Sequence, residues 1–182
     1  MKDIQRALFD AVGLRLASIG FKSRSVAQSF LRPFPGGRAS LHLAFIKHPS
    51  DFDVIADVAV RFDELEEIVN ASNLLLSEKE KGQTYSLGAE LGNISGEGQM
   101  RWNVASPSEV EQVADRLVAK FKAIGLPYLE KASTLIGAYE LLTSPGRGAW
   151  LHSPIHESRA TRIVALGRIL VERAGCQARS PD

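Results

Sequence analysis

The stretch Asp51-Phe52-Asp53-Val54-Ile55-Ala56-Asp57-Val58-Ala59-Val60-Arg61-Phe62 decides the fold class of this chain. Its even-numbered residues are all apolar, whereas its odd-numbered residues include three aspartates and an arginine. Successive side chains of a β-strand point to opposite faces, so this alternation gives one apolar face and one wetter face. An antiparallel sheet with one covered face carries that pattern, while a parallel sheet covered on both faces would be apolar throughout. We therefore predict an antiparallel sheet with one buried face.

The same alternation recurs on both sides of this strand. Pro35-Gly36-Gly37 is a turn signal, because glycine adopts positive φ without steric cost. Leu41, Leu43 and Phe45 alternate with smaller or polar residues after that turn, which indicates the second arm of a hairpin. Strands are predicted at 25–34, 40–45, 52–62, 85–91 and 100–104. Five strands joined by short turns predict a meander.

Helical spacing dominates the two ends of the chain. Apolar residues recur every three or four positions over 4–19, and Gly20 is placed as the left-handed residue that ends this helix. Ser106-Pro107-Ser108-Glu109 has the residues of a capping box, so a helix should run from there to Gly125. Further helices are predicted at 63–69, at 133–142 and from 153 to about 175. Loops or connectors are predicted at 77–83, 92–98, 126–130 and 144–148.

Together these elements predict one α+β domain over residues 1–182. We expect a central antiparallel meander of about five strands, with helices packed on one face and a helical C-terminal third. Residues 1–105 should form the first helix and the sheet, 106–176 the helical part, and 177–182 a frayed tail. A chain of this length is large enough to bury a core.

Charge and composition exclude several classes of function. Of the 182 residues, 45% are hydrophobic and 24% are charged, close to the average of globular proteins. Lys and Arg number 22 against 21 for Asp and Glu, which leaves a net charge of +1. A nucleic-acid binder usually has a basic excess, so we expect no nucleic-acid partner.

The sequence indicates a cytoplasmic protein without a membrane partner. Charged residues at Lys2, Asp3 and Arg6 occupy the place where a secretory signal needs an apolar core, and no segment approaches transmembrane length. A single cysteine, Cys176, rules out an internal disulfide and suits a reducing compartment.

Motifs for metal, nucleotide or catalysis are absent from the sequence. His152 and His156 have the spacing of two ligands on one helical face, but Pro154 lies between them and no third ligand is evident. The glycine-rich segments 88–92 and 96–98 lack the Gly-Lys-Ser ending of a phosphate-binding loop. We therefore expect no catalytic residue, no metal and no cofactor.

Three segments of the sequence are distinctive: Arg101-Trp102-Asn103-Val104, the connector Gly125-Leu126-Pro127-Tyr128-Leu129-Glu130 and the stretch 150–170. With them the chain resembles a bacterial family of unknown function. The resemblance covers most of the chain and implies the helix, meander and helix order, but no activity and no catalytic residue. Some small domains of this kind are similar to proteins that neutralise polymorphic toxins, which implies a protein partner such as a toxin or a regulatory protein.

Polar residues share the second face of the predicted sheet. These are His42, Asp57, Ser86, Glu90, Arg101 and Asn103. They either converge in a shallow groove or form an ordinary solvated face. Outside the sheet, Trp150 lies beyond a glycine-rich break and can anchor an interface, while Arg159 and Arg162 on the last helix can grip a carboxylate or phosphate.

Two functions remain open on these observations. The first is a non-enzymatic protein-binding domain of the immunity or regulatory type. The alternative is a small-molecule-binding protein or an enzyme that uses the polar sheet face, which predicts a pocket at His42, Asp57, Glu90 or Arg101. Self-association as a homo-oligomer, through an open sheet edge or the final helix, is a third hypothesis.

Overall fold

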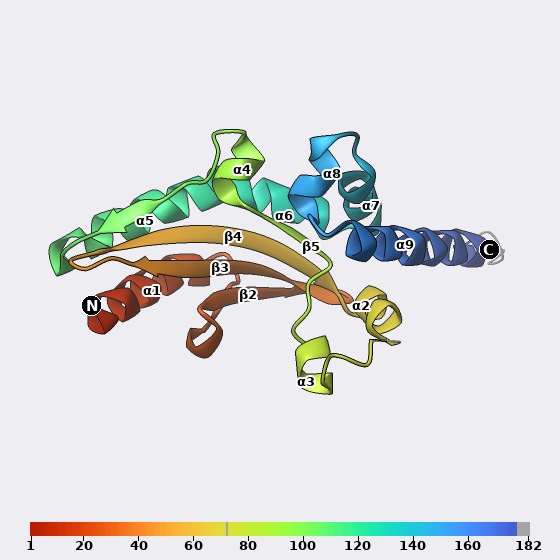
Figure 1. Cartoon of the computed structure of the whole chain (residues 1–182), viewed down its shortest axis with the longest axis horizontal. Helices are drawn as coiled ribbons and strands as arrows, with labels where there is room; N and C mark the ends of the chain where they lie inside the picture. Colours follow the sequence, from red (N-terminus) through yellow and green to blue (C-terminus); the bar gives the residue numbers. More distant parts are fainter. Residues whose placement is uncertain (72, 178–182) are drawn as a thin grey trace.

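A sheet with its helices mostly on one side forms the body of the protein (Figure 1). The computed structural model describes residues 1–71 and 73–177, except for the side chains of 176 and 177. The strands are β1 (Lys22–Arg24), β2 (Ser29–Phe34), β3 (Gly37–Lys47), β4 (Phe52–Phe62), β5 (Leu87–Glu90) and β6 (Trp102–Val104). The helices are α1 (Lys2–Ala17), α2 (Asp63–Asn70), α3 (Glu78–Lys81), α4 (Leu91–Ser95), α5 (Val110–Lys120), α6 (Leu126–Ala132), α7 (Leu135–Thr143), α8 (Arg147–His152) and α9 (His156–Gln177). The predicted α+β class is confirmed.

All strand pairs in the sheet are antiparallel, in the order β1-β2-β3-β4-β5. The hairpin of β2 and β3 turns at Pro35 and Gly36, as the sequence predicts, with Gly36 at a φ of 81°. One detail of the meander differs, because β6 pairs with β4 and not with β5. The inserted helix α4 carries the chain from one end of this edge to the other, so β5 and β6 share a single edge of β4.

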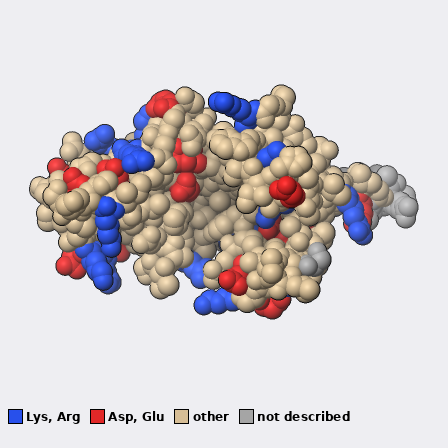
Figure 2. Space-filling view, viewed as in Figure 1, with Lys and Arg blue, Asp and Glu red and all other residues tan. Residues whose placement is uncertain are grey.

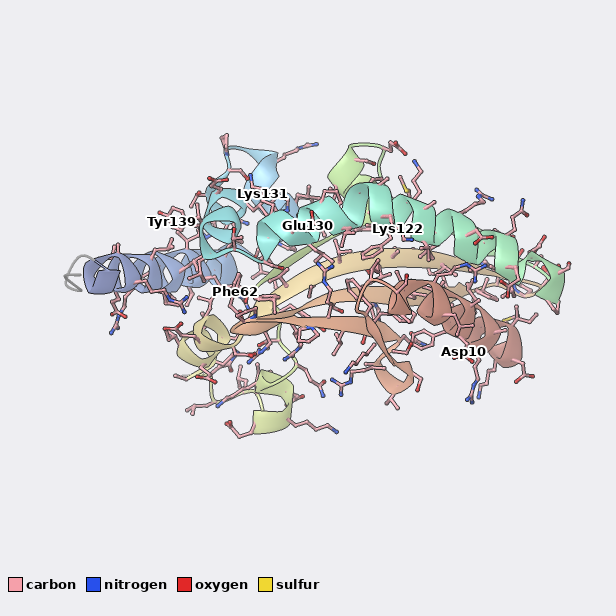
Figure 3. The ribbon with its side chains drawn as sticks, turned by 180° about the vertical axis from the view of Figure 1, so that it is seen from behind. Asp10, Phe62, Lys122, Glu130, Lys131 and Tyr139 are labelled. Carbon is pink, nitrogen blue, oxygen red and sulfur yellow. The ribbon has the colours of Figure 1, made fainter. Side chains whose placement is uncertain are left out.

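The predicted apolar face is buried. Leu41 lies opposite Val58 and Leu43 opposite Ala56, and all four side chains have no exposed surface. Helices α1 and α5 contact each other on this side, and Figure 3 shows them in front of the strands. One cluster of buried residues reaches from Leu8 in α1 to Ile169 in α9.

Local signals explain how α1 and α5 begin and end. Helix α1 spans Lys2–Ala17, about two residues earlier than predicted at each end, and Gly20 adopts the predicted positive φ of 84°. Phe21 folds back so that its amide donates to the carbonyl of Leu16, at 3.3 Å. Before α5, Ser106 and Glu109 form the predicted capping box around the 3-10 turn η2 (Pro107–Glu109).

The predicted strand 25–34 is too long. Its first residues form the 3-10 turn η1 (Ser25–Ala27), and Gln28 has a φ of 48°, so β2 starts at Ser29. The preceding residues form the short edge strand β1, which the sequence does not predict. All three of its residues are exposed and two are basic, which protects an edge from pairing with other chains.

Two predicted loops contain helical turns. In the segment 77–83, Ser77 and Glu80 form a capping box around the single turn α3. In the segment 92–98, the Glu90 carboxylate accepts hydrogen bonds from the amides of Gly92 and Asn93, which starts α4. Leu91 therefore belongs to a helix, although its spacing fits the predicted strand 85–91.

The predicted connector 126–130 is helical. Helix α5 runs into the π turn η3 (Phe121–Gly125), where the amide of Leu126 bonds the carbonyl of Phe121 five residues back, and then into α6. Pro127 is tolerated because it lies in the first turn of α6. Gly125 does not end the helix but allows close packing, since an added Cβ would lie 2.7 Å from the Phe121 ring and 2.8 Å from the Leu91 side chain.

The last elements differ from the prediction in their bounds, since α7 begins two residues and α9 three residues later than predicted. The break at 144–148 ends in the short helix α8, which follows Gly146 at a φ of 62°. Helix α9 begins at His156 and packs on α2 and α7, and its C-terminal part extends beyond the other helices (Figure 1). Residues 178–182 of the predicted tail lie outside the described residues. Among the helices described, none has the length and apolar character needed to cross a membrane.

Candidate functional site: the uncovered face of the sheet

Among the described elements, no helix covers the middle of the second face of the sheet. At one end of this face, Arg61 donates to the carbonyl of Lys81 in α3 and Arg38 to the carbonyl of Gly82. Figure 1 looks onto this face, with α1 and α5 behind the strands. In the space-filling view it is a shallow hollow of mostly uncharged atoms with acidic side chains at its border (Figure 2). Ser29, Ser40 and Ile55, which share this face by register, have only 2–7% exposure.

The predicted pair His42 and Asp57 lies in the middle of this face. The two residues are cross-strand partners of β3 and β4, and His42 Nδ1 lies 3.7 Å from Asp57 Oδ2. Their side chains are 44% and 43% exposed, so the pair meets solvent on the open side. An exposed pair at this separation contributes little stability and remains free to bind a partner.

Glu90 is opposite Asp57 in the register but its carboxylate has another role. It accepts hydrogen bonds from the amides of Gly92, Asn93 and Met100, at 2.9, 2.9 and 3.0 Å. Its residue surface is only 7% exposed. Glu90 therefore fixes α4 and the start of the segment that leads to β6.

Asp53 contacts two of the other predicted polar residues, Arg101 and Asn103. Its Oδ1 accepts from Asn103 Nδ2 at 3.1 Å, while Oδ2 lies 3.2 Å from His48 Nε2 and 3.6 Å from Arg101 Nη1. The Asn103 hydrogen bond, with further contributions from His48 and Arg101, holds the pKa of Asp53 below its ordinary value against the effect of burial. The sheet thus carries a mixed-charge cluster of Asp53, His48, Arg101 and Asn103 next to the His42–Asp57 pair.

Large apolar side chains project beside this face. Val26 in η1 is fully exposed, and Leu74 and Leu75 between α2 and α3 are 92% and 94% exposed. In Figure 1 both segments project from the lower border of the sheet. Isolated exposed leucines are common, whereas two adjacent ones form a larger exposed apolar surface. The triplet Leu74-Leu75-Leu76 between two helices is the sequence signal that could have identified it.

Arg162 grips a carboxylate, but one from its own chain. Its guanidinium donates Nε to Glu66 Oε1 at 2.8 Å and Nη2 to Oε2 at 2.9 Å. Glu66 has no exposed surface, and Asn70 also donates to it, at 3.4 Å. Burial alone would raise the pKa of Glu66, but Arg162, aided by Thr84 and Ser86, brings it below the ordinary value. This network ties α9 to α2.

The remaining predicted residues make other contacts. Ser86 is buried and its hydroxyl accepts from the Phe62 amide at 3.0 Å, while Arg159 donates to the carbonyl of Ser153 before α9. Trp150 on α8 is 59% exposed, in keeping with its predicted place on the surface. Trp102 packs in the core.

The two histidines considered as metal ligands serve other purposes. His152 is buried, and its Nδ1 lies 3.1 Å from the hydroxyl of Tyr128. Burial, and secondarily the charge of Lys131, lowers the pKa of His152. His156 begins α9. Among the described residues no group of three or more metal-binding side chains comes together.

Two cavities lie on other parts of the surface. A groove of about 510 Å³ lies where the β2–β3 turn, α2, α7 and α9 meet, and Phe62, Leu65 and Ile169 line it (Figure 3 labels Phe62 at this junction). A smaller one of about 290 Å³ lies between α2 and α3, beside Arg61 and Glu66. The described lining of neither cavity includes the predicted residues of the open face.

Comparison with known proteins gave no relatives. No family model, no curated protein and no solved structure matches this chain.

Proposed function

We propose that this chain is a non-enzymatic protein-binding protein, of the immunity or regulatory type, that receives its partner on the uncovered face of the sheet. The observation that supports it most is the pair Leu74 and Leu75, 92% and 94% exposed beside that face. When a partner covers an exposed leucine, the burial stabilises the complex by about 1.5–3 kcal/mol for each fully buried side chain.

The composition of the open face also suits a protein partner. It combines small and apolar residues, such as Ser40 and Ile55, with the carboxylates of Asp53 and Asp57 and the guanidinium of Arg101. Interfaces commonly combine apolar contacts with polar groups that set orientation and specificity. The proposed partner is therefore a folded protein, a toxin or a regulatory protein, with apolar and charged groups in the complementary order.

A capture experiment with matched variants tests this proposal. The chain, tagged at its N-terminus, should retain one protein from its host in a stoichiometric amount that survives gel filtration. The triple variant Val26→Ser, Leu74→Ser and Leu75→Ser should lose it. Leu14→Ser is the control, because Leu14 is 79% exposed on α1, on the other side of the sheet. Retention by the triple variant, or equal loss in the control, would contradict the proposal.

The alternative of a small-molecule site is supported by one observation. The His48 imidazole lies 3.2 Å from the Asp53 carboxylate, with His48 39% exposed, so an accessible acid–base pair is present on the open face. A thermal-shift screen of polar metabolites on the wild-type protein and on Asp53→Asn would test it. A ligand that stabilises only the wild type would favour this alternative over the protein partner.

A further inference from the structure

An outward stripe runs along α9, bordered by Tyr139 of α7 at Gly167 and by the groove between α2, α7 and α9 at Ala174. It consists of Ala160, Val164, Gly167, Val171 and Ala174, spaced alternately by four and three residues. Val164 and Val171 are 74% and 73% exposed. This spacing places one seam on a helix, about 21 Å long, which is the pattern with which two helices pack.

No close contact among the described residues requires a glycine at position 167. An added Cβ would lie 3.7 Å from the Tyr139 ring, which is an ordinary contact. Glycine inside a helix nevertheless costs about 1 kcal/mol relative to alanine. A small residue at the centre of an exposed seam lets the backbone of another helix approach closely, which gives this glycine a use.

The stripe is complementary to itself in size when two copies run antiparallel. In an antiparallel alignment centred at residue 169, the numbers of two residues that face each other add up to 338. Gly167 then lies opposite the partner's Val171, and Val164 opposite the partner's Ala174. Every large residue faces a small one, and the two-fold axis repeats both contacts.

The flanking charges fit the same alignment. Within one helix the Arg168 guanidinium donates to Glu172 at 2.7 Å, and both side chains are exposed. In the antiparallel pair each Arg168 comes close to the partner's Glu172, so two ion pairs of opposite charge border the seam. We propose that the outward stripe of α9 binds the same stripe of a second copy, and that the protein forms an antiparallel homodimer through this helix.

The geometry of the fold leaves room for this dimer. The end of α9 extends beyond the helices it packs on (Figure 1), and Ile136 of the adjacent α7 is 64% exposed and can extend the contact. The interface is small, so we expect a dissociation constant in the micromolar range. The uncovered sheet face takes no part in it.

Sedimentation across a concentration series tests the dimer. The wild type should change from monomer to dimer, and Val164→Glu with Val171→Glu should weaken dimerisation about tenfold or more, because it places charges in the seam. Leu14→Glu, an equally exposed change on α1, should dimerise like the wild type. Circular dichroism should show all variants folded. A wild type that stays monomeric to millimolar concentration, or equal behaviour of the seam variant and the control, would overturn the proposal.

Charge variants test the ion pairs across the seam. Arg168→Glu and Glu172→Arg should each dimerise more weakly than the wild type, because each homodimer would place like charges together. An equimolar mixture of the two variants should form a heterodimer, because the chain that is acidic at both positions then meets a chain that is basic at both. The change within one helix is the same in the mixture as in the separate samples, so it cannot produce this recovery. A mixture that associates no better than its components would rule out ion pairs across the seam and with them the proposed dimer.

Discussion

At the scale of single residues, the strongest polar interactions lie inside the molecule and not on the open face. Glu66 and Arg162 are 0% and 12% exposed and form two hydrogen bonds, whereas His42 and Asp57 are nearly half exposed and 3.7 Å apart. A buried pair that loses one member leaves an uncompensated charge, while an exposed pair loses little. Arg162 should therefore matter for stability and His42 for binding.

Removing one member of the buried pair should be costly. We expect Arg162→Met or Glu66→Leu to lower the free energy of unfolding by about 3–5 kcal/mol, and the double variant to recover most of this loss. Urea denaturation measures it. Arg168→Met is the control, since its pair with Glu172 is exposed and should cost less than about 1 kcal/mol. Losses in the double variant that equal the sum of the single ones would contradict the prediction.

The same pair gives the stability a dependence on acid pH. The pKa of Glu66 is lower in the folded protein than in the unfolded chain, so the unfolded chain takes up the proton first. Its contribution is complete above the unfolded pKa of about 4.3 and is lost as the pH falls through the folded value. Denaturation midpoints between pH 6 and pH 3 should therefore fall more steeply for the wild type than for the Glu66→Leu and Arg162→Met double variant.

His152 should titrate with a pKa below the ordinary value of about 6.5, because burial disfavours its charged form. The unfolded chain then binds this proton first, so the contribution of neutral His152 is complete above pH 6.5 and is lost as the pH falls through the folded pKa. Imidazole resonances in an NMR titration measure the pKa of His152, and a folded pKa above about 6.5 would contradict the prediction.

The hydroxyl of Tyr128 should contribute to stability as well. Tyr128→Phe should lower the free energy of unfolding by about 1–2 kcal/mol, since it removes the hydrogen-bond partner of His152.

At the scale of elements, the sequence predicts what depends on periodicity and caps, and misses what depends on contacts. Strand β4 and the capping box at Ser106 follow from local residues alone. Gly125 has the residue type of a helix end, yet its surroundings in the fold make it a packing position. The open face was predicted as a set of residues sharing parity, but only the structure shows that Glu90 turns to cap α4. The pairing of Arg162 with Glu66 joins residues 96 positions apart, which no local pattern can predict.

Two glycines in helical segments should respond oppositely to alanine. Gly125→Ala should lower the free energy of unfolding by about 1–3 kcal/mol, because its Cβ would press against Phe121 and Leu91. Gly175→Ala in α9 meets no atom within 4 Å and should raise it by about 0.5–1 kcal/mol, since alanine favours the helix. Thermal unfolding of both variants measures the difference. Two changes of the same sign would show that packing at Gly125 does not decide its effect.

At the scale of the whole molecule, one face of the sheet provides stability and the other is open to contacts with other molecules. The face under α1 and α5 holds the core that gives stability, and the same core reaches α9 through Leu166 and Ile169. The other face and the outer side of α9 contribute little to that core, so their exposed apolar residues are free to serve contacts with other molecules. Substitutions on these two surfaces should change association and leave unfolding nearly unchanged.

Because one core joins both ends of the chain, the protein should unfold in a single transition. Trp102 is buried between the strands and α5, whereas Trp150 is 59% exposed on α8, so Trp150→Phe leaves fluorescence that reports mainly on the sheet. In that variant, the urea transitions seen by fluorescence and by far-ultraviolet circular dichroism should coincide. Leu16→Ala in α1 and Leu166→Ala in α9, both fully buried, should shift both transitions together, each by about 2–5 kcal/mol. If Leu166→Ala shifted the circular dichroism transition alone, the C-terminal helices would be a separate unit that unfolds before the sheet.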